Sequence, residues 1–219
     1  MSGQKINVPM LGVFLGAVAA ISAGLLSGVY ALTEPKIKLN KQEAARVAMI
    51  QVLPEFDNSP GEETILLRSA LDWPVKYYVA RKEGEIVGYA GEVVTPEGFS
   101  GDVAVLASLT PEGEIDKVIV TANTETPGLG TAITDRKVQK TIIDLIKGGD
   151  AVEGLVPNKY LDWYTGKTAG ESRWEMAKDG ESINAKTGAT ITSSAVCGAV
   201  YAIGKTAVDH LETLSKGVE

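Results

Sequence analysis

The feature that most constrains this chain of 219 residues is Val8–Leu32, a run of 25 residues without one charged side chain. A helix needs about 20 apolar residues to cross the hydrocarbon core of a bilayer, so this run is long enough. It would be apolar on every face, which favours lipid over the core of a small soluble domain. The run predicts one membrane-spanning helix, about residues 8–32, within an anchor of residues 1–33 that precedes a domain of residues 34–219.

A cleaved signal peptide is the main alternative for this segment. The apolar region of a signal peptide is usually only about 7–15 residues long, and its basic region is usually stronger than the single Lys5 here. Val29-Tyr30-Ala31 nevertheless fits a small-residue cleavage pattern, so the alternative stays open. Lysines flank the run on both sides, so the positive-inside rule does not decide its orientation.

Small residues recur at every fourth position of the run, at Gly12, Gly16, Ala20, Gly24 and Gly28. Such rows let helices in lipid approach one another closely, which would suit packing against partner membrane subunits. Glycine and alanine are also common in membrane helices, so chance explains the spacing equally well.

The composition excludes several classes of function. One cysteine and one histidine, Cys197 and His210, are too few for a disulfide framework or a four-ligand zinc site. A net charge of −7 argues against nucleic-acid binding, which needs clustered lysine and arginine. We therefore expect no metal site and no nucleic-acid partner.

The local patterns after the run predict helices on either side of β-hairpins. Pro35 is expected to end the membrane helix, and residues 41–53 have the spacing of a short amphipathic helix that ends at Pro54. Two more helices are expected over residues 134–147 and 192–215.

An alternation of period two predicts antiparallel strands between these helices. A strand is also possible at residues 64–68. The two expected hairpins are formed by Val75–Arg81 with Glu85–Val94, and by Asp102–Leu109 with Glu114–Ala122. The fold class is therefore α+β: one transmembrane helix followed by a compact domain of antiparallel β-hairpins and flanking helices.

Three segments are not explained by secondary structure alone. The first is Glu125–Thr131, directly after the fourth expected strand, where Pro127 and Gly128 suit the centre of a type II turn. Gly130 would let a ligand approach the backbone closely. The segment has neither the G-x-G-x-x-G pattern nor a lysine after the glycines, so it supports neither a Rossmann site nor a P-loop.

The second segment, residues 184–194, leads into the last expected helix. It is dense in hydroxyl groups, carried by Thr187, Thr190, Thr192, Ser193 and Ser194. Helix capping needs only one such residue, and a helix N-terminus flanked by hydroxyls also suits a phosphate group. From the residues alone, capping and phosphate binding both stay open.

The third segment concentrates aromatic residues, although these make up only 6% of the chain. It contains Trp163 and Tyr164, and Trp174 follows shortly after them. These rings suit a hydrophobic core, and they would equally suit the flanks of a flat ligand.

Together these segments resemble the FMN-binding domain shared by the G subunit of Rnf electron-transport complexes and the C subunit of the sodium-pumping NADH:quinone oxidoreductase. The resemblance rests on the N-terminal membrane helix, on Glu125–Gly130 after a strand, and on Thr187-Gly188-Ala189-Thr190 before the last helix. It covers essentially the whole chain. The modest length and the stretch from Ser172 to Gly180 look more like the Rnf subunit.

The resemblance implies a covalently bound cofactor. In the family, a flavin transferase attaches FMN through a phosphoester to the last threonine of the (Ser/Thr)-Gly-Ala-Thr motif, which is Thr190 here. The chain departs from the pattern at Asn184, where the family has an acidic residue; asparagine keeps an acceptor and loses the charge. The resemblance also implies flavin contacts from Glu125, Thr126, Gly128, Leu129, Gly130, Thr187, Gly188, Ala189 and Thr192, with Trp163 and Trp174 as aromatic neighbours.

The function expected from this resemblance is that of a membrane-anchored flavoprotein. It would relay electrons in an Rnf-type complex that couples ferredoxin and NAD chemistry to ion transport, with no independent catalysis. Its partners would be the other membrane subunits, the flavin transferase and the bilayer. The soluble domain would face the extracytoplasmic side of the cell membrane. The alternatives are the sodium-pump C subunit, a standalone extracytoplasmic flavoprotein, or an anchored binding domain without redox chemistry.

Overall fold

The structure is a computed structural model that describes residues 8–136, 155–170, 174, 176–177 and 183–217. The chain divides into two compact units, Met1–Ala44 and Ala45–Glu219. The first unit consists of helix in its described part, and the second holds the sheet and the remaining helices.

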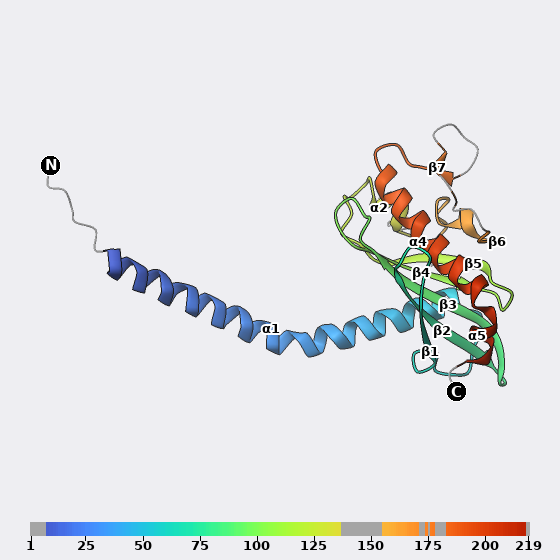
Figure 1. The fold of residues 1–219 in the computed structure, drawn as a ribbon, viewed down its shortest axis with the longest axis horizontal. Helices are drawn as coiled ribbons and strands as arrows, with labels where there is room; N and C mark the ends of the chain where they lie inside the picture. Colours follow the sequence, from blue (N-terminus) through green and yellow to red (C-terminus); the bar gives the residue numbers. More distant parts are fainter. Residues whose placement is uncertain (1–7, 137–154, 171–173, 175, 178–182, 218–219) are drawn as a thin grey trace, which may run out of the picture. The chain divides into compact units, whose positions relative to one another are not determined.

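The N-terminal helix is longer than the sequence suggests. Helix α1 runs without interruption over Val8–Val52, with Pro35 inside it (Figure 1). Pro35 therefore does not end the helix, and the expected separate helix over residues 41–53 is the last part of α1. A proline removes one backbone hydrogen bond and strains its helix, but the turns beyond it can still form.

The apolar part of α1 meets the requirements of a membrane span. It covers Pro9–Ile37, 29 residues, and none of its most apolar window is buried in the protein. Thr190–Asp209 is shorter, 20 residues, and less apolar, and this helix is mostly buried and belongs to the core of the second unit. In the described part of the chain, Pro9–Ile37 is thus the long apolar helical segment that the protein does not bury.

The second unit contains a six-stranded antiparallel sheet whose strands follow one another in chain order. Both expected hairpins are confirmed, and the strand expected at residues 64–68 forms one edge. The strands are β1 (Thr64–Arg68), β2 (Pro74–Lys82), β3 (Glu85–Thr95), β4 (Val103–Leu109), β5 (Glu114–Ala122) and β6 (Lys167–Thr168). Two short parallel strands, β7 (Met176–Ala177) and β8 (Ile183–Asn184), form a separate pair.

The helices of the second unit differ partly from expectation. The single helix expected over 192–215 is two helices, α4 (Thr190–Asp209) and α5 (Leu211–Lys216), which are separated at His210. The short helix α2 (Thr131–Thr134) is followed by extended backbone at Asp135. The helix expected over 134–147 is therefore absent at Asp135 and Arg136, and its remaining residues, 137–147, lie outside the described part of the chain. The described elements also include the 3-10 helix η1 (Asp162–Tyr164).

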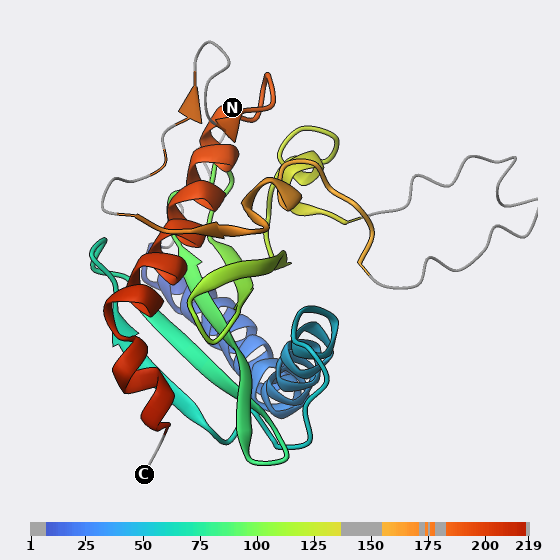
Figure 2. The same cartoon turned by 90° about the vertical axis from the view of Figure 1, so that its right-hand side faces the viewer.

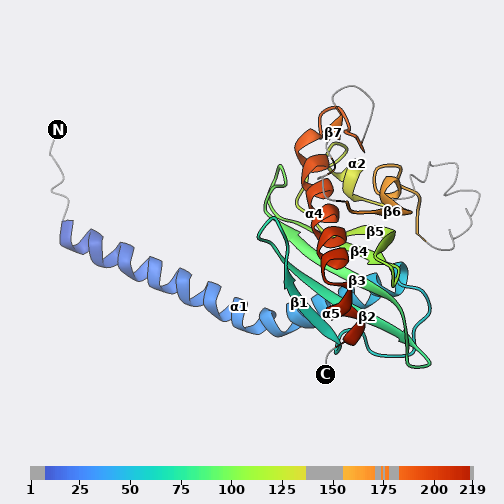
Figure 3. The same ribbon diagram turned by 45° about the vertical axis from the view of Figure 1, so that its right-hand side comes forward.

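Helices cover both faces of the sheet because successive strand residues point to opposite sides. Helix α4 packs across one face (Figure 2), where its apolar residues join a core with alternate residues of β2, β3 and β4. The last turns of α1 cover the other face, where Ala48, Met49, Val52 and Leu53 pack against Tyr78, Ala80, Ala90, Leu106 and Ile119. The N-terminal end of α4 lies near α2 and β7 (Figure 3).

Truncation of Ile203 should show how much the packing of α4 contributes to stability. Ile203 is fully buried against the sheet, so Ile203→Ala should lower the free energy of unfolding by about 2–5 kcal/mol. Ile191 lies on the same helix and is 53% exposed, so Ile191→Ala should change it by no more than about 0.5 kcal/mol. Urea titration of the detergent-solubilised protein measures both values. Equal effects of the two variants would contradict the packing described here.

Candidate functional site

Two of the three unusual sequence segments form one cavity. It has a volume of about 280 Å³ and lies where the segment after β5 meets the first turn of α4. A third side comes from the loop between β3 and β4. The lining residues are Phe99, Glu125, Thr126, Leu129, Gly130, Gly188, Ala189, Thr190, Ile191 and Thr192.

Both segments reach the cavity through tight turns of the same kind. In each turn, the fourth residue donates its N–H to the carbonyl of the first: Leu129 to Thr126 at 3.2 Å, and Ala189 to Lys186 at 2.9 Å. The third residue is a glycine with positive φ, +79° at Gly128 and +84° at Gly188, as a type II turn requires. The side chain of Lys186 joins the turns, because its Nζ donates to the Gly128 carbonyl at 2.6 Å.

A buried carboxylate holds the three sides of the cavity together. Glu125 is only 5% exposed. Its Oε2 accepts a hydrogen bond from the Thr192 hydroxyl at 2.8 Å, and its Oε1 accepts one from the Phe99 N–H at 2.8 Å. The Ser100 N–H adds a longer contact of 3.4 Å to Oε1. Hydrogen bonds to a charged acceptor are stronger than neutral ones, so this carboxylate fixes the geometry of the site.

The position of Glu125 depends on a glycine beside it. A Cβ atom on Gly130 would lie 2.5 Å from Glu125 Oε2 and 3.0 Å from Thr192 Oγ1. The contact with Oε2 leaves no room for a side chain, so a residue larger than glycine would push the carboxylate away from Thr192. Gly130 was expected to let a ligand approach the backbone closely. In the structure, its missing side chain leaves room for the carboxylate of Glu125.

The hydroxyl groups of the second segment differ in their surroundings. Thr192 is buried and bonded to Glu125, and Ser193 is buried with its Oγ donating to the Ala189 carbonyl at 2.8 Å. Thr187 is exposed but does not line the cavity, and Ser194 is half-buried outside it. Thr190 is exposed and lines the cavity, at the first residue of α4.

The first turn of α4 also leaves its backbone N–H groups available to a ligand. Ala189 occupies the N-cap position, and no side chain caps the helix there. The first backbone N–H groups of a helix lack partners within the helix and carry the positive end of its dipole. This arrangement is suited to a phosphate group bound at the first turn.

The cavity contains most of the expected flavin contacts but not all of them. Gly128 and Thr187 do not line it; Gly128 faces a neighbouring hollow together with Lys186. Asn184 lies in β8. Phe99 and Ile191 line the cavity although they were not expected from the sequence. A lone aromatic residue in the glycine-rich loop between two strands is the signal that could have indicated Phe99.

Trp163 and Trp174 lie elsewhere, in an aromatic cluster that packs against the core. The rings of Trp163 and Trp174 are 6.0 Å apart, and Tyr164 and Tyr201 complete the cluster at similar distances. Burial raises the pKa of Tyr164, so its hydroxyl stays protonated. None of these rings lines the cavity at Thr190, so the structure gives them a role in packing.

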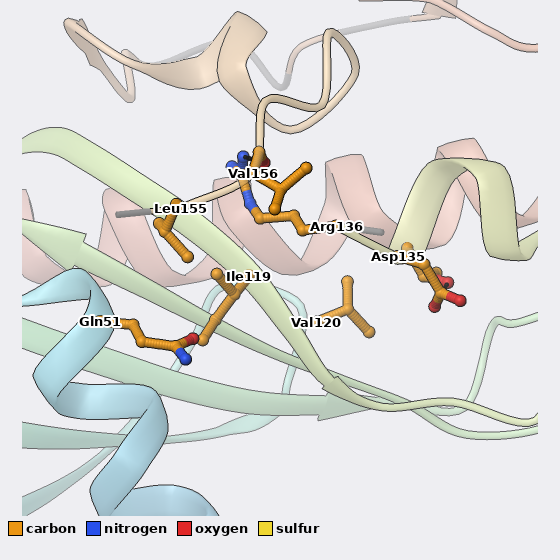
Figure 4. Close-up of a pocket in the computed structure, with 8 residues that line it drawn as sticks. Gln51, Ile119, Val120, Asp135, Arg136, Leu155 and Val156 are labelled. Atoms are coloured by element: carbon orange, nitrogen blue, oxygen red, sulfur yellow. Dashed lines mark hydrogen bonds between the residues drawn. The ribbon is translucent and has the colours of Figure 1, made fainter. Parts of the chain in front are cut away.

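A second cavity, of about 310 Å³, lies between the end of α1, β5 and residues 155–156 (Figure 4). The lining residue Arg136 is already engaged, since its guanidinium donates to the carbonyls of Val118 and Val156 and pairs with Asp162 at 2.7 Å. This cavity contains no residue of the two motif segments, and its arginine holds the surrounding backbone in place.

A family model places the part of the chain that forms the cavity among FMN-binding domains. The family model described as FMN-binding domain matches residues 98–203, which include every lining residue of the cavity at Thr190. The model described as RnfG N-terminal region matches residues 3–52, which include all of α1.

Comparison with curated proteins identifies the family more closely. The chain is 32% identical to the G subunit of the ion-translocating oxidoreductase complex of Haemophilus influenzae strain PittEE, over 84% of this chain and 83% of that protein. Proteins of the same name from Shewanella piezotolerans and Pseudomonas aeruginosa strain UCBPP-PA14 are 31% and 30% identical, over 86% and 85% of this chain and 84% and 82% of theirs. The chain belongs to the family formed by the G subunits of ion-translocating oxidoreductase complexes.

Removal of the Thr192 hydroxyl should destabilise the site. Thr192→Val keeps the shape of the side chain but takes a hydrogen-bond donor from the buried Glu125, so the free energy of unfolding should fall by about 1–3 kcal/mol. Thr126→Val, at an exposed position in the same cavity, should change it by no more than about 0.5 kcal/mol. Urea titration of both purified variants measures the difference, and a neutral Thr192→Val would contradict the role assigned to Glu125.

Proposed function

We propose that the chain carries FMN in the cavity at Thr190, joined to the threonine oxygen through a phosphoester. The observation that carries this proposal is the setting of Thr190. Of the five hydroxyl-bearing residues in the segment, it alone is both exposed and part of the cavity lining. Geometry and family resemblance therefore favour the same residue, from independent starting points.

The surroundings of Thr190 fit the parts of FMN. The uncapped first turn of α4 offers backbone N–H groups to the phosphate. The apolar side chains of Phe99, Leu129 and Ile191 offer contact surface to the ring. Gly188, which also lines the cavity, has no side chain that could occupy the space beside the Thr190 hydroxyl. The residues present thus match a ligand with one anionic end and one flat apolar end.

FMN supplies one- and two-electron transfer, and the protein's task is to hold and tune it. The phosphoester keeps the cofactor on one chain, which suits the passing of electrons between fixed partners. Glu125 holds the three sides of the cavity at fixed positions. The hydrogen bond from Lys186 to the Gly128 carbonyl joins its two turns. No side chain needs to act as acid or base in this role.

The wider function follows from the relatives. They are named as subunits of an ion-translocating oxidoreductase complex, and this chain is proposed to be the corresponding electron-transfer subunit. Its partners would be the other membrane subunits of the complex and a flavin transferase. The apolar segment of α1, Pro9–Ile37, would cross the cell membrane once and leave the FMN domain on the extracytoplasmic side. The names of the relatives favour this complex over the sodium pump and its C subunit.

Covalent attachment at Thr190 predicts that the flavin stays on the protein after denaturation. Protein made together with a flavin transferase should give a fluorescent band on a denaturing gel and gain the mass of one FMN less one water. Thr190→Ala should lose both signals completely, because no oxygen is left to form the ester. Thr213→Ala, an exposed threonine on α5, should keep both, and peptide mapping should find the flavin on Thr190.

Two outcomes would contradict this proposal at different levels. A covalent flavin that survives Thr190→Ala would show that another residue is the site of attachment. A wild-type protein without flavin, in a host whose transferase modifies a known substrate, would refute the function as a covalent flavoprotein.

The proposed orientation can be tested with a single added thiol. Cys197 is buried, so the wild type should react little with a thiol reagent that does not cross membranes. Thr213→Cys should be labelled from outside in intact spheroplasts, because α5 would lie on the extracytoplasmic side. Labelling that requires lysis of the spheroplasts would reverse the orientation.

A further inference from the structure

Exposed apolar side chains gather at the cavity of Thr190. Among the described residues of the second unit, seven large hydrophobic side chains are exposed, and three of them line this cavity. These three are Phe99, 66% exposed, Ile191, 53%, and Leu129, 45%. Phe99 is the aromatic member of the seven. Exposed apolar groups that converge on one cavity indicate a surface that is covered in the working protein.

The loop that carries Phe99 is held firmly from beneath. The Phe99 N–H donates to the buried carboxylate of Glu125 at 2.8 Å. One residue further on, the Ser100 carbonyl accepts a hydrogen bond from the Thr124 hydroxyl at 2.9 Å. The backbone on either side of the phenyl ring is therefore tied to the segment after β5. The exposure of the ring results from this fixed backbone and not from a loose loop.

The residues that Glu125 connects lie far apart in the sequence. Phe99 is 26 residues from Glu125, and Glu125 is 67 residues from Thr192. The same carboxylate thus fixes the backbone of Phe99 on one side and the helix that begins at Thr190 on the other. A ligand attached at Thr190 would therefore share the cavity with the Phe99 ring. The backbone that carries this ring is held at a fixed position relative to Thr190.

We propose that Phe99 is a cofactor-contacting residue, whose phenyl ring packs against the isoalloxazine ring of the flavin held at Thr190. This inference rests on the proposed function, since it needs FMN at that residue. The ring contact fits the chemistry of both groups: two aromatic surfaces bury apolar area against each other and gain from their complementary quadrupoles. Leu129 and Ile191 complete the apolar surface around the flavin, and Thr190 sets where the flavin begins.

The test uses the full chain, flavinylated in a host that has the transferase, and reads flavin emission. An indole or phenol in contact with a flavin quenches its emission by giving an electron to the excited ring, which then returns it; a phenyl ring does not. Phe99→Trp should therefore lower the emission yield several-fold and shorten its lifetime. Phe99→Tyr should act in the same direction. Leu66→Trp, at an exposed position on β1 outside the cavity, should match the wild type.

The flavin content of every variant is measured by mass after denaturation, which separates the two levels of the proposal. Denaturation should also restore equal emission per flavin in all variants. If Phe99→Trp and Phe99→Tyr carry FMN and emit as the wild type does, the contact with Phe99 is refuted while the flavin at Thr190 stands. If no variant and no wild-type protein carries covalent FMN, the proposed function fails and this inference fails with it.

Discussion

Glu125 places a carboxylate inside the domain, and a buried carboxylate is costly unless donors surround it. Its donors in the described structure are a threonine hydroxyl and two backbone N–H groups, contributed by α4 and by the loop between β3 and β4. Because these groups must converge on one side chain, three distant segments are held at fixed positions. The cavity at Thr190 is the space they leave between them.

The strands β2 to β5 and the turn at Pro127-Gly128 could be predicted from the sequence because their signals are local. Alternation of period two and short turns predicted the hairpins that form β2 to β5. The Pro127-Gly128 turn follows from the φ preferences of its residues. The cavity's third side could not be predicted in this way. A lone aromatic residue in this loop could indicate Phe99 itself, but nothing in the sequence indicates the hydrogen bond from its N–H to Glu125 that brings it to the cavity.

Other expectations were wrong because tertiary packing outweighed local preference. Pro35 favours a helix end, yet α1 continues because the turns beyond it gain a partner: Met49 and Val52 pack against the sheet. The helical backbone of α1 therefore leads directly from the apolar segment into the second unit. Trp163 and Trp174 suited either a core or the flanks of a flat ligand by composition, and in the structure they are partly buried and pack against the core.

The order of the strands along the chain determines when the cavity at Thr190 can form during synthesis. Each strand from β1 to β5 pairs with the next one made, whereas α4 contacts strands far behind it; the Tyr77 hydroxyl donates to the Ile203 carbonyl 126 residues away. Synthesis proceeds from the N-terminus, so the strands are complete before α4 leaves the ribosome. Thr190 gains its neighbours Glu125 and Phe99 only then. A growing chain therefore exposes the sheet before the cavity at Thr190 has formed, and under the proposed function an enzyme that modifies Thr190 would meet this cavity only after α4 has packed.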